Sequence, residues 1–200
     1  MEQTTIDNQS IEQEEQESLV KAKKGDAEAC CLVGRMYQRG HGGMPKSNEI
    51  AVEWYTKAAE QGYAMGQYLL GLQFEIGKGV PQSDEKAFSL MSRAAEQGLD
   101  CATCELGYLY YKGKGVSQSD AKAFELFMNA AEHGFALAMR RVAQCYERGI
   151  GVSQSDEEAS KWWIKAAEAG DGDAKMVMDA EDGDQDAKLL LSFFSLRSTL

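Results

Sequence analysis

A repeat with a period of 36 residues constrains the fold of this chain more than any other feature of its sequence. The pattern Ala-Ala-Glu-x-Gly recurs at this interval and ends at Gly62, Gly98, Gly134 and Gly170. A weaker copy ends at Gly25, 37 residues before Gly62. Internal repeats of about 20 to 50 residues are typical of solenoids, propellers and other arrays, so we expect a row of similar stacked units.

Each repeat has the pattern of two helices joined by a turn. The second copy predicts a first helix over residues 63–76, here called helix A, and a second, helix B, over residues 84–97. The spacing i, i+3, i+4, i+7 that marks one helical face is occupied in helix A by Gln67, Leu70, Gly71 and Phe74. Gly77 and Gly79 predict the turn between the helices. No alternation with a period of two persists, so we expect no strands.

Polar residues mark where the B helices begin. Ser83, Ser119 and Ser155 precede acidic or helix-forming residues and can cap the helix that follows. Ser155 has Glu158 three residues later, which predicts a reciprocal capping box.

Glycines also stand inside the A helices, at Gly34, Gly71 and Gly107, where each costs about 1 kcal/mol relative to alanine. We expect a close approach of helix B to offset that cost. The facing residues expected there are also small, namely Ala58, Ala94 and Ala130.

The combined pattern resembles the Sel-1-like repeat family. It reads Ala-x-x-x-Leu-Gly-x-x-Tyr/Phe-x-x-Gly-x-Gly-Val and then Ala-Ala-Glu-x-Gly, most clearly over residues 66–98 and 102–134. Four copies cover about residues 22–170, although the fourth has Val142-Ala143 in place of Leu-Gly. The resemblance implies an all-α protein, a right-handed α/α superhelix related to tetratricopeptide arrays, used mainly as a scaffold for protein assembly.

The ends of the chain fit a capped array, because terminal repeats need a polar outer face. We expect an acidic disordered leader at residues 1–10, an N-terminal capping helix at 11–24 and a degenerate C-terminal repeat with capping helices at 171–200. Between them lie four repeats at about 25–61, 62–97, 98–133 and 134–169.

Charge and hydropathy exclude several classes of function. The formal net charge is −11, and an acidic chain lacks the basic face that nucleic-acid binding needs. The acidic excess lies at the two ends, since residues 19–167 carry 18 basic and 18 acidic side chains. No run of about 18 apolar residues is present, so membrane insertion is not expected. The N-terminus lacks the basic and apolar regions of a secretory leader, so we expect a cytoplasmic protein.

The five cysteines are an odd number, and because no secretory leader is recognised, a reducing cytosol and free thiols are expected. Cys101 and Cys104 have the spacing of a redox or zinc motif, but the strand-then-helix context is missing. His41 and His133 are the only histidines that could complete a metal site. We therefore expect no metal and no cofactor.

The candidate binding residues lie on the A helices at positions off the core stripe, which line the concave face in tetratricopeptide arrays. These positions differ between copies, whereas the core positions agree. Aromatic residues and arginine are the usual interface anchors. The predicted protein-binding residues are Arg35, Arg39, Met65, Tyr68, Leu72, Tyr108, Tyr111, Arg140 and Arg148.

These observations favour a non-enzymatic scaffold or adaptor, expected to be a monomer, that binds a peptide or protein segment with an apolar centre and acidic flanks. An immunity or inhibitor protein that neutralises a toxin is an alternative. A hydrolase is the third hypothesis, because a cysteine-rich branch of the family includes β-lactam binders. This chain lacks that branch's cysteine pairing, and no catalytic triad, phosphate loop or zinc-protease motif is present, so we expect no catalysis.

Overall fold

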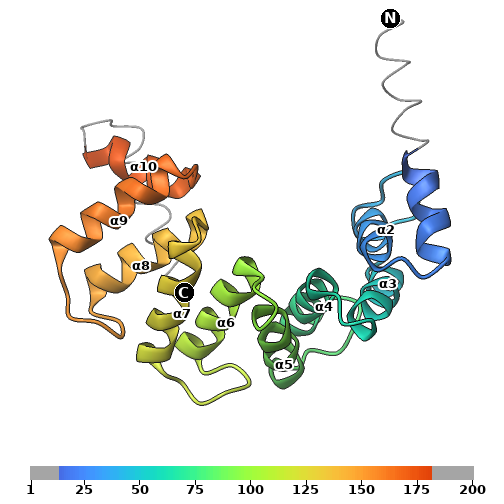
Figure 1. Cartoon of the computed structure of the whole chain (residues 1–200), viewed down its shortest axis with the longest axis horizontal. Helices are drawn as coiled ribbons and strands as arrows, with labels where there is room; N and C mark the ends of the chain where they lie inside the picture. Colours follow the sequence, from blue (N-terminus) through green and yellow to red (C-terminus); the bar gives the residue numbers. More distant parts are fainter. Residues whose placement is uncertain (1–13, 182–200) are drawn as a thin grey trace, which may run out of the picture. The chain divides into compact units, whose positions relative to one another are not determined.

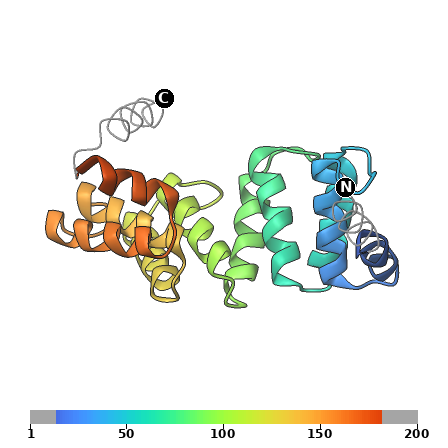
Figure 2. The same cartoon turned by 90° about the horizontal axis from the view of Figure 1, so that it is seen from above.

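The computed structural model describes residues 14–181, all of whose regular elements are α-helices. The predicted leader at residues 1–10 and the predicted C-terminal region beyond residue 181 lie outside the described residues. The helices run as consecutive antiparallel pairs along the chain (Figures 1 and 2). A first helix spans residues 14–23. It is followed by α2 (Ala27–Arg39), α3 (Asn48–Glu60), α4 (Ala64–Ile76), α5 (Asp84–Ala95), α6 (Asp100–Lys112), α7 (Asp120–Glu132), α8 (Ala136–Arg148), α9 (Asp156–Glu168) and α10 (Gly172–Glu181).

The described residues divide into two compact units. Unit 1 comprises residues 14–102 and 114–116, and unit 2 comprises residues 103–113 and 117–181. In unit 1, α2 packs on α3 and α4 packs on α5, while in unit 2, α8 packs on α9. These pairs are the predicted hairpins, and α4 and α5 begin within one residue of the predicted positions.

Each unit has its own apolar core. The core of unit 1 is built around Tyr55, Val33 and Leu70, with the buried Ala22 of the first helix at its edge. The core of unit 2 is built around Val142, Phe127 and Trp163. Small side chains contribute heavily to both, because alanine is the most frequent buried residue in the repeat and allows the helices to approach closely.

Serine caps join the two helices of each hairpin. The hydroxyls of Ser83, Ser119 and Ser155 accept hydrogen bonds from the backbone three residues later, as predicted, and Ser47 does the same for α3. The backbone N–H of Ser155 donates to the carbonyl of Tyr146 in the last turn of α8, at 3.0 Å. In a capping box, the Ser155 N–H would instead donate to the Glu158 carboxylate. The prediction of a reciprocal box was therefore wrong for this second bond, and the Glu158 carboxylate accepts from Lys161.

The glycines inside the A helices make room for large residues, which corrects the expectation of small facing partners. A Cβ at Gly34 would lie 2.7 Å from Cδ1 of Tyr55, and one at Gly107 would lie 2.8 Å from Cε1 of Phe127. In the first and third copies, helix B therefore places an aromatic ring directly over the backbone of helix A, whereas in the second copy the Met91 side chain lies 3.1 Å from a Cβ at Gly71. An aromatic ring reaches farther than an alanine side chain. The residue of helix A that lies beneath the ring must therefore be a glycine.

Candidate protein-binding surface

One face of helix A is built from the same four repeat positions in both units. In α8 these positions are Arg141, Gln144, Cys145 and Arg148, and in α2 they are Leu32, Arg35, Met36 and Arg39. Their spacing of i, i+3, i+4 and i+7 places them on one side of the helix. We call this face the A-strip, and in each unit it lines a hollow in the surface.

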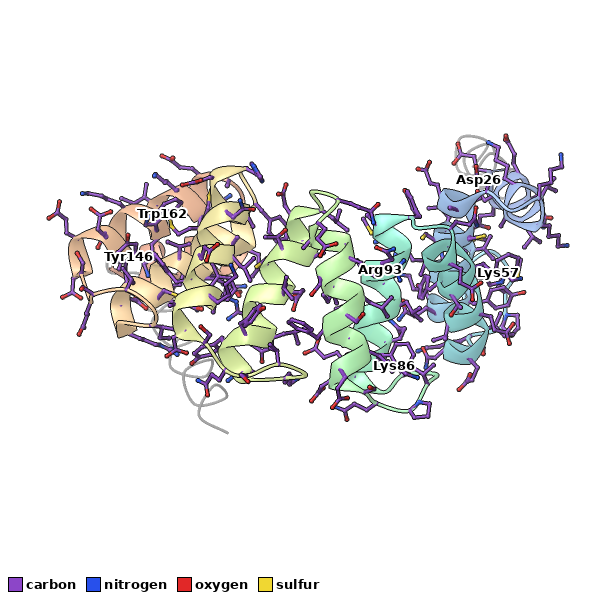
Figure 3. The ribbon with its side chains drawn as sticks, turned by 60° about the horizontal axis from the view of Figure 1, so that its bottom comes forward. Asp26, Lys57, Lys86, Arg93, Tyr146 and Trp162 are labelled. Atoms are coloured by element: carbon purple, nitrogen blue, oxygen red, sulfur yellow. The ribbon has the colours of Figure 1, made fainter. Side chains whose placement is uncertain are left out.

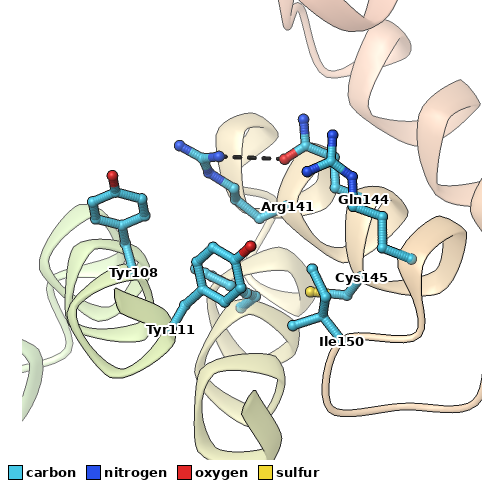
Figure 4. Close-up of a pocket in the computed structure, with 8 residues that line it drawn as sticks. Tyr108, Tyr111, Arg141, Gln144, Cys145 and Ile150 are labelled. Atoms are coloured by element: carbon cyan, nitrogen blue, oxygen red, sulfur yellow. Dashed lines mark hydrogen bonds between the residues drawn. The ribbon is translucent and has the colours of Figure 1, made fainter. Parts of the chain in front are cut away.

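The hollow in unit 2, here called the unit-2 hollow, has an aromatic wall and an arginine wall. Tyr108 and Tyr111 come from α6 and stand across from Arg141, Gln144 and Cys145 of α8 (Figure 4). Phe127 of α7 and Ile150, just after α8, complete an apolar floor. The cavity volume is about 50 Å³, which suits one side chain rather than a whole small molecule.

Positive charge dominates the unit-2 hollow. The Arg141 guanidinium lies 5.4 Å from the centroid of the Tyr108 ring and donates to Oε1 of Gln144 at 3.3 Å. Lys112 Nζ lies 4.9 Å from the centroid of the Tyr111 ring. Burial raises the pKa of the Cys145 thiol to about 12 against the opposing fields of Arg141 and Arg148, so this floor residue is a neutral thiol at pH 7.

The corresponding hollow in unit 1, here called the unit-1 hollow, has an acidic wall in place of the aromatic one. Arg35, Arg39 and Leu32 of α2 line it together with Glu14 and Glu15 of the first helix. Its volume is about 350 Å³, so it is larger than the unit-2 hollow. Leu32 has 44% of its surface exposed there. The first helix therefore contributes carboxylates to the same hollow that the arginines of this A-strip line.

The structure places eight of the nine predicted binding residues in three environments. Tyr108, Tyr111 and Arg148 line the unit-2 hollow, and Arg35 and Arg39 line the unit-1 hollow. The remaining residues of unit 1 lie on α4, where Met65 and Tyr68 pack partly buried against the core and Leu72 is half-buried.

Arg140 does not join these residues. Its Nε lies 3.0 Å from Asp171, and its guanidinium also lies 3.1 Å from Asp173. Asp171 in turn accepts from the backbone N–H of Ala174 at 2.8 Å, capping the start of α10. The arginine is 18% exposed and ties α8 to α10, so it serves packing between helices.

Arg141 is the charged residue of the unit-2 hollow that the sequence analysis missed. The predicted binding residues on this helix were Arg140 and Arg148, and Arg141 was not among them. A stripe drawn through Gln144 and Arg148 with helical spacing would have included Arg141. The carboxylate of the neighbouring Glu147 is engaged within unit 2, because it accepts a hydrogen bond from Nε1 of Trp163 at 2.7 Å.

The described residues offer no group of three His, Cys, Asp or Glu side chains that could hold a metal ion. All five cysteines are free, and Cys101 and Cys104 both lie on α6. Burial raises the pKa of Cys31 to about 12, which keeps it in its unreactive thiol form.

Asp26, at the start of α2, and Lys57 on α3 are exposed charged residues of unit 1 (Figure 3). None of the helices within residues 14–181 combines the length and apolarity that crossing a bilayer requires.

Antiparallel helix pairs with a 36-residue period define a helical-repeat protein. The Sel1 repeat model matches at residues 27–63, 64–99, 102–135 and 136–171, so this chain belongs to the Sel1 repeat family, whose members are mostly non-enzymatic scaffolds for protein interactions. No curated protein matches the chain.

Solved structures share the fold. A protective antigen with an SLR fold from uropathogenic Escherichia coli is 35% identical with a TM-score of 0.73, and a Sel1 repeat protein from Oxalobacter formigenes is 36% identical with a TM-score of 0.70. Each alignment covers 78% of this chain, but only 33% and 62% of those proteins, respectively. An immunity protein from Pseudomonas aeruginosa is 22% identical over 78% of this chain and 58% of its own, with a TM-score of 0.54, which is a likeness of fold alone.

Proposed function

We propose that this chain is a non-enzymatic adaptor that binds a segment of another protein on the A-strip. The observation that carries the proposal is the unit-2 hollow, where Tyr108, Tyr111 and Arg148 converge on an apolar floor. Tyrosine and arginine are enriched at binding hot spots because they combine large contact area with polar ends. The repeat pattern also supports binding by the A-strip. Its positions carry different residues in different copies, whereas the core positions carry similar ones.

The experiment compares the full chain with the double variant Tyr108→Ala and Tyr111→Ala. A library of random linear peptides is selected for binding to the full chain, and the affinities of the selected peptides for both proteins are measured by fluorescence polarisation. Because the two rings form one wall of the hollow, we expect the variant to bind at least about tenfold more weakly. Equal affinity of the two proteins for every selected peptide would contradict the proposal.

The control for this experiment is Tyr37→Ala on α2. Tyr37 is partly buried against the core of unit 1 and lines neither hollow. It reports what the loss of one tyrosine does to the protein in general. A matching loss of affinity in this variant would show that the effect of the double variant is not local to the hollow.

The proposal includes a cytoplasmic, monomeric protein. The five free thiols support a reducing compartment, where cysteines stay unpaired. An immunity protein would be an adaptor with a toxin as its partner; the likeness to such a protein concerns the fold alone and does not favour this alternative.

A further inference from the structure

The charges of the unit-2 hollow are unbalanced within the hollow itself. Arg141 and Arg148 line it, Lys112 lies against the Tyr111 ring, and none of its described lining residues carries a carboxylate. Asp120 is the acidic residue whose field reaches Cys145 from the start of α7. It lies at a helix N-terminus, where the helix dipole already stabilises a negative charge. The hollow therefore has an excess of positive charge.

In the unit-1 hollow, acidic residues of the chain itself line the hollow together with the A-strip. Glu14 and Glu15 of the first helix line it together with Arg35 and Arg39. These arginines occupy the positions that Gln144 and Arg148 hold in α8. In unit 1 acidic side chains of the chain itself thus line the hollow beside the arginines, whereas in unit 2 the opposite wall consists of the two tyrosines.

The size of the unit-2 hollow limits what can enter it. A volume of about 50 Å³ admits a group of a few atoms, such as a side-chain carboxylate, and is much smaller than pockets for drug-sized ligands. The apolar floor formed by Phe127, Cys145 and Ile150 offers contact for the methylene groups that carry such a carboxylate. Arginine suits the carboxylate because its donors form a planar fork that can bind both oxygens.

We propose that the unit-2 hollow receives the carboxylate of an aspartate or glutamate in the partner segment, held by Arg141 and Arg148 between the tyrosine wall and the apolar floor. This inference rests on the proposed function and specifies its partner: an acidic peptide segment rather than an apolar one. Removing one partner of a desolvated charge pair weakens binding strongly, because the other charge is left without its counterion.

The test uses peptides selected on the full chain and the double variant Arg141→Gln and Arg148→Gln. We expect the selected peptides to share an acidic residue. Replacing it with its amide should weaken binding to the full chain about tenfold and leave binding to the variant nearly unchanged, as a double-mutant cycle requires. The control is Lys57→Gln and Arg93→Gln, which removes the same charge from two exposed positions on α3 and α5 that line neither hollow, and it should retain the affinity.

The outcomes separate this inference from the proposed function. Tyrosine-dependent peptides that bind equally well as acid and amide would overturn the carboxylate site and leave the adaptor function standing. An equal loss in the Lys57 and Arg93 control would also overturn it, because the effect would then be one of net charge. Peptides whose binding ignores both the tyrosines and the arginines would contradict the proposed function itself. Phosphoserine at the acidic position, if bound more tightly than glutamate, would overturn the choice of a carboxylate in favour of a phosphate.

Discussion

At the scale of single residues, the contact between Gly34 and Tyr55 decides how closely the first two repeat helices pack. The Tyr55 side chain is fully buried, and its hydroxyl donates to Oε1 of Gln38 at 3.1 Å. The Gln38 amide then donates to Oε1 of Gln73 on α4 at 3.1 Å. The Tyr55 ring is fixed at one end by its bond to Cβ and at the other by the hydrogen bond of its hydroxyl, so it has little freedom to move aside.

We therefore expect Gly34→Ala to destabilise the protein. Alanine favours a helix by up to about 1 kcal/mol relative to glycine, but overpacking a buried site typically costs about 1–3 kcal/mol, and the rigid ring makes the second effect the larger one. The midpoint of urea unfolding should fall. Gly172→Ala is the control, because nothing lies within 4 Å of a Cβ at that position. A midpoint equal to or above that of the unchanged protein would show that the ring can yield.

The same contact shows what the sequence could and could not predict at this scale. A glycine inside a helical pattern indicates a close approach, and Gly34, Gly71 and Gly107 all have one. Which residue approaches depends on the rotation of helix B about its own axis, and both Ala58 and Tyr55 lie on the buried side of α3. A periodic pattern identifies the buried side but does not order its members by distance from the neighbouring helix.

At the scale of helices, the serine caps determine where each B helix begins. The Ser83 hydroxyl accepts from the N–H of Lys86 at 3.3 Å, and the Ser83 N–H donates to the carbonyl of Phe74 at 3.0 Å. One residue therefore satisfies a free donor of α5 and ties α5 to the end of α4.

We expect Ser83→Ala to lower the free energy of unfolding by about 0.5–2 kcal/mol, because alanine cannot accept that hydrogen bond. Ser83→Gly should cost only a few tenths of a kcal/mol, since glycine is a tolerated cap. Urea unfolding followed by circular dichroism measures both changes. An alanine variant no less stable than the glycine variant would mean that the hydroxyl contributes nothing to α5.

The positions of the helices were predictable, whereas the register of the binding face was not. Repeating serines and glycines fix where the helices begin and end, and four copies of the pattern reinforce one another. The A-strip depends on the rotation of α8 relative to α6, and neighbouring residues on a helix point about 100° apart. Arg140 and Arg141 have the same side chain, so only packing distinguishes the one that binds Asp171 from the one that lies over Tyr108.

At the scale of the whole molecule, each of the two cores contains a buried acid that is neutral at pH 7. Burial raises the pKa of Cys31 and of Tyr55 in unit 1 to about 12, from ordinary values of 9.0 and 10.0, and raises that of Cys145 in unit 2 to about 12, also from 9.0. These groups bind their protons more tightly in the folded protein than in the unfolded one.

Stability should therefore fall in alkaline solution. The folded state is favoured fully below about pH 9, where the thiols are protonated in both states, and this contribution is lost as the pH rises from about 9 toward 12, because the unfolded chain releases protons that the folded chain retains. Urea midpoints measured between about pH 7 and 11 should show this decline. Cys31→Ala combined with Cys145→Ala removes both thiols whose pKa is raised to about 12 and should make the decline shallower, leaving the parts due to Tyr55 and to Cys30 and Tyr63, whose pKa values burial also raises. A midpoint that stays constant over this range, or a decline as steep in the alanine variant, would mean that ionisation of the buried thiols does not limit alkaline stability.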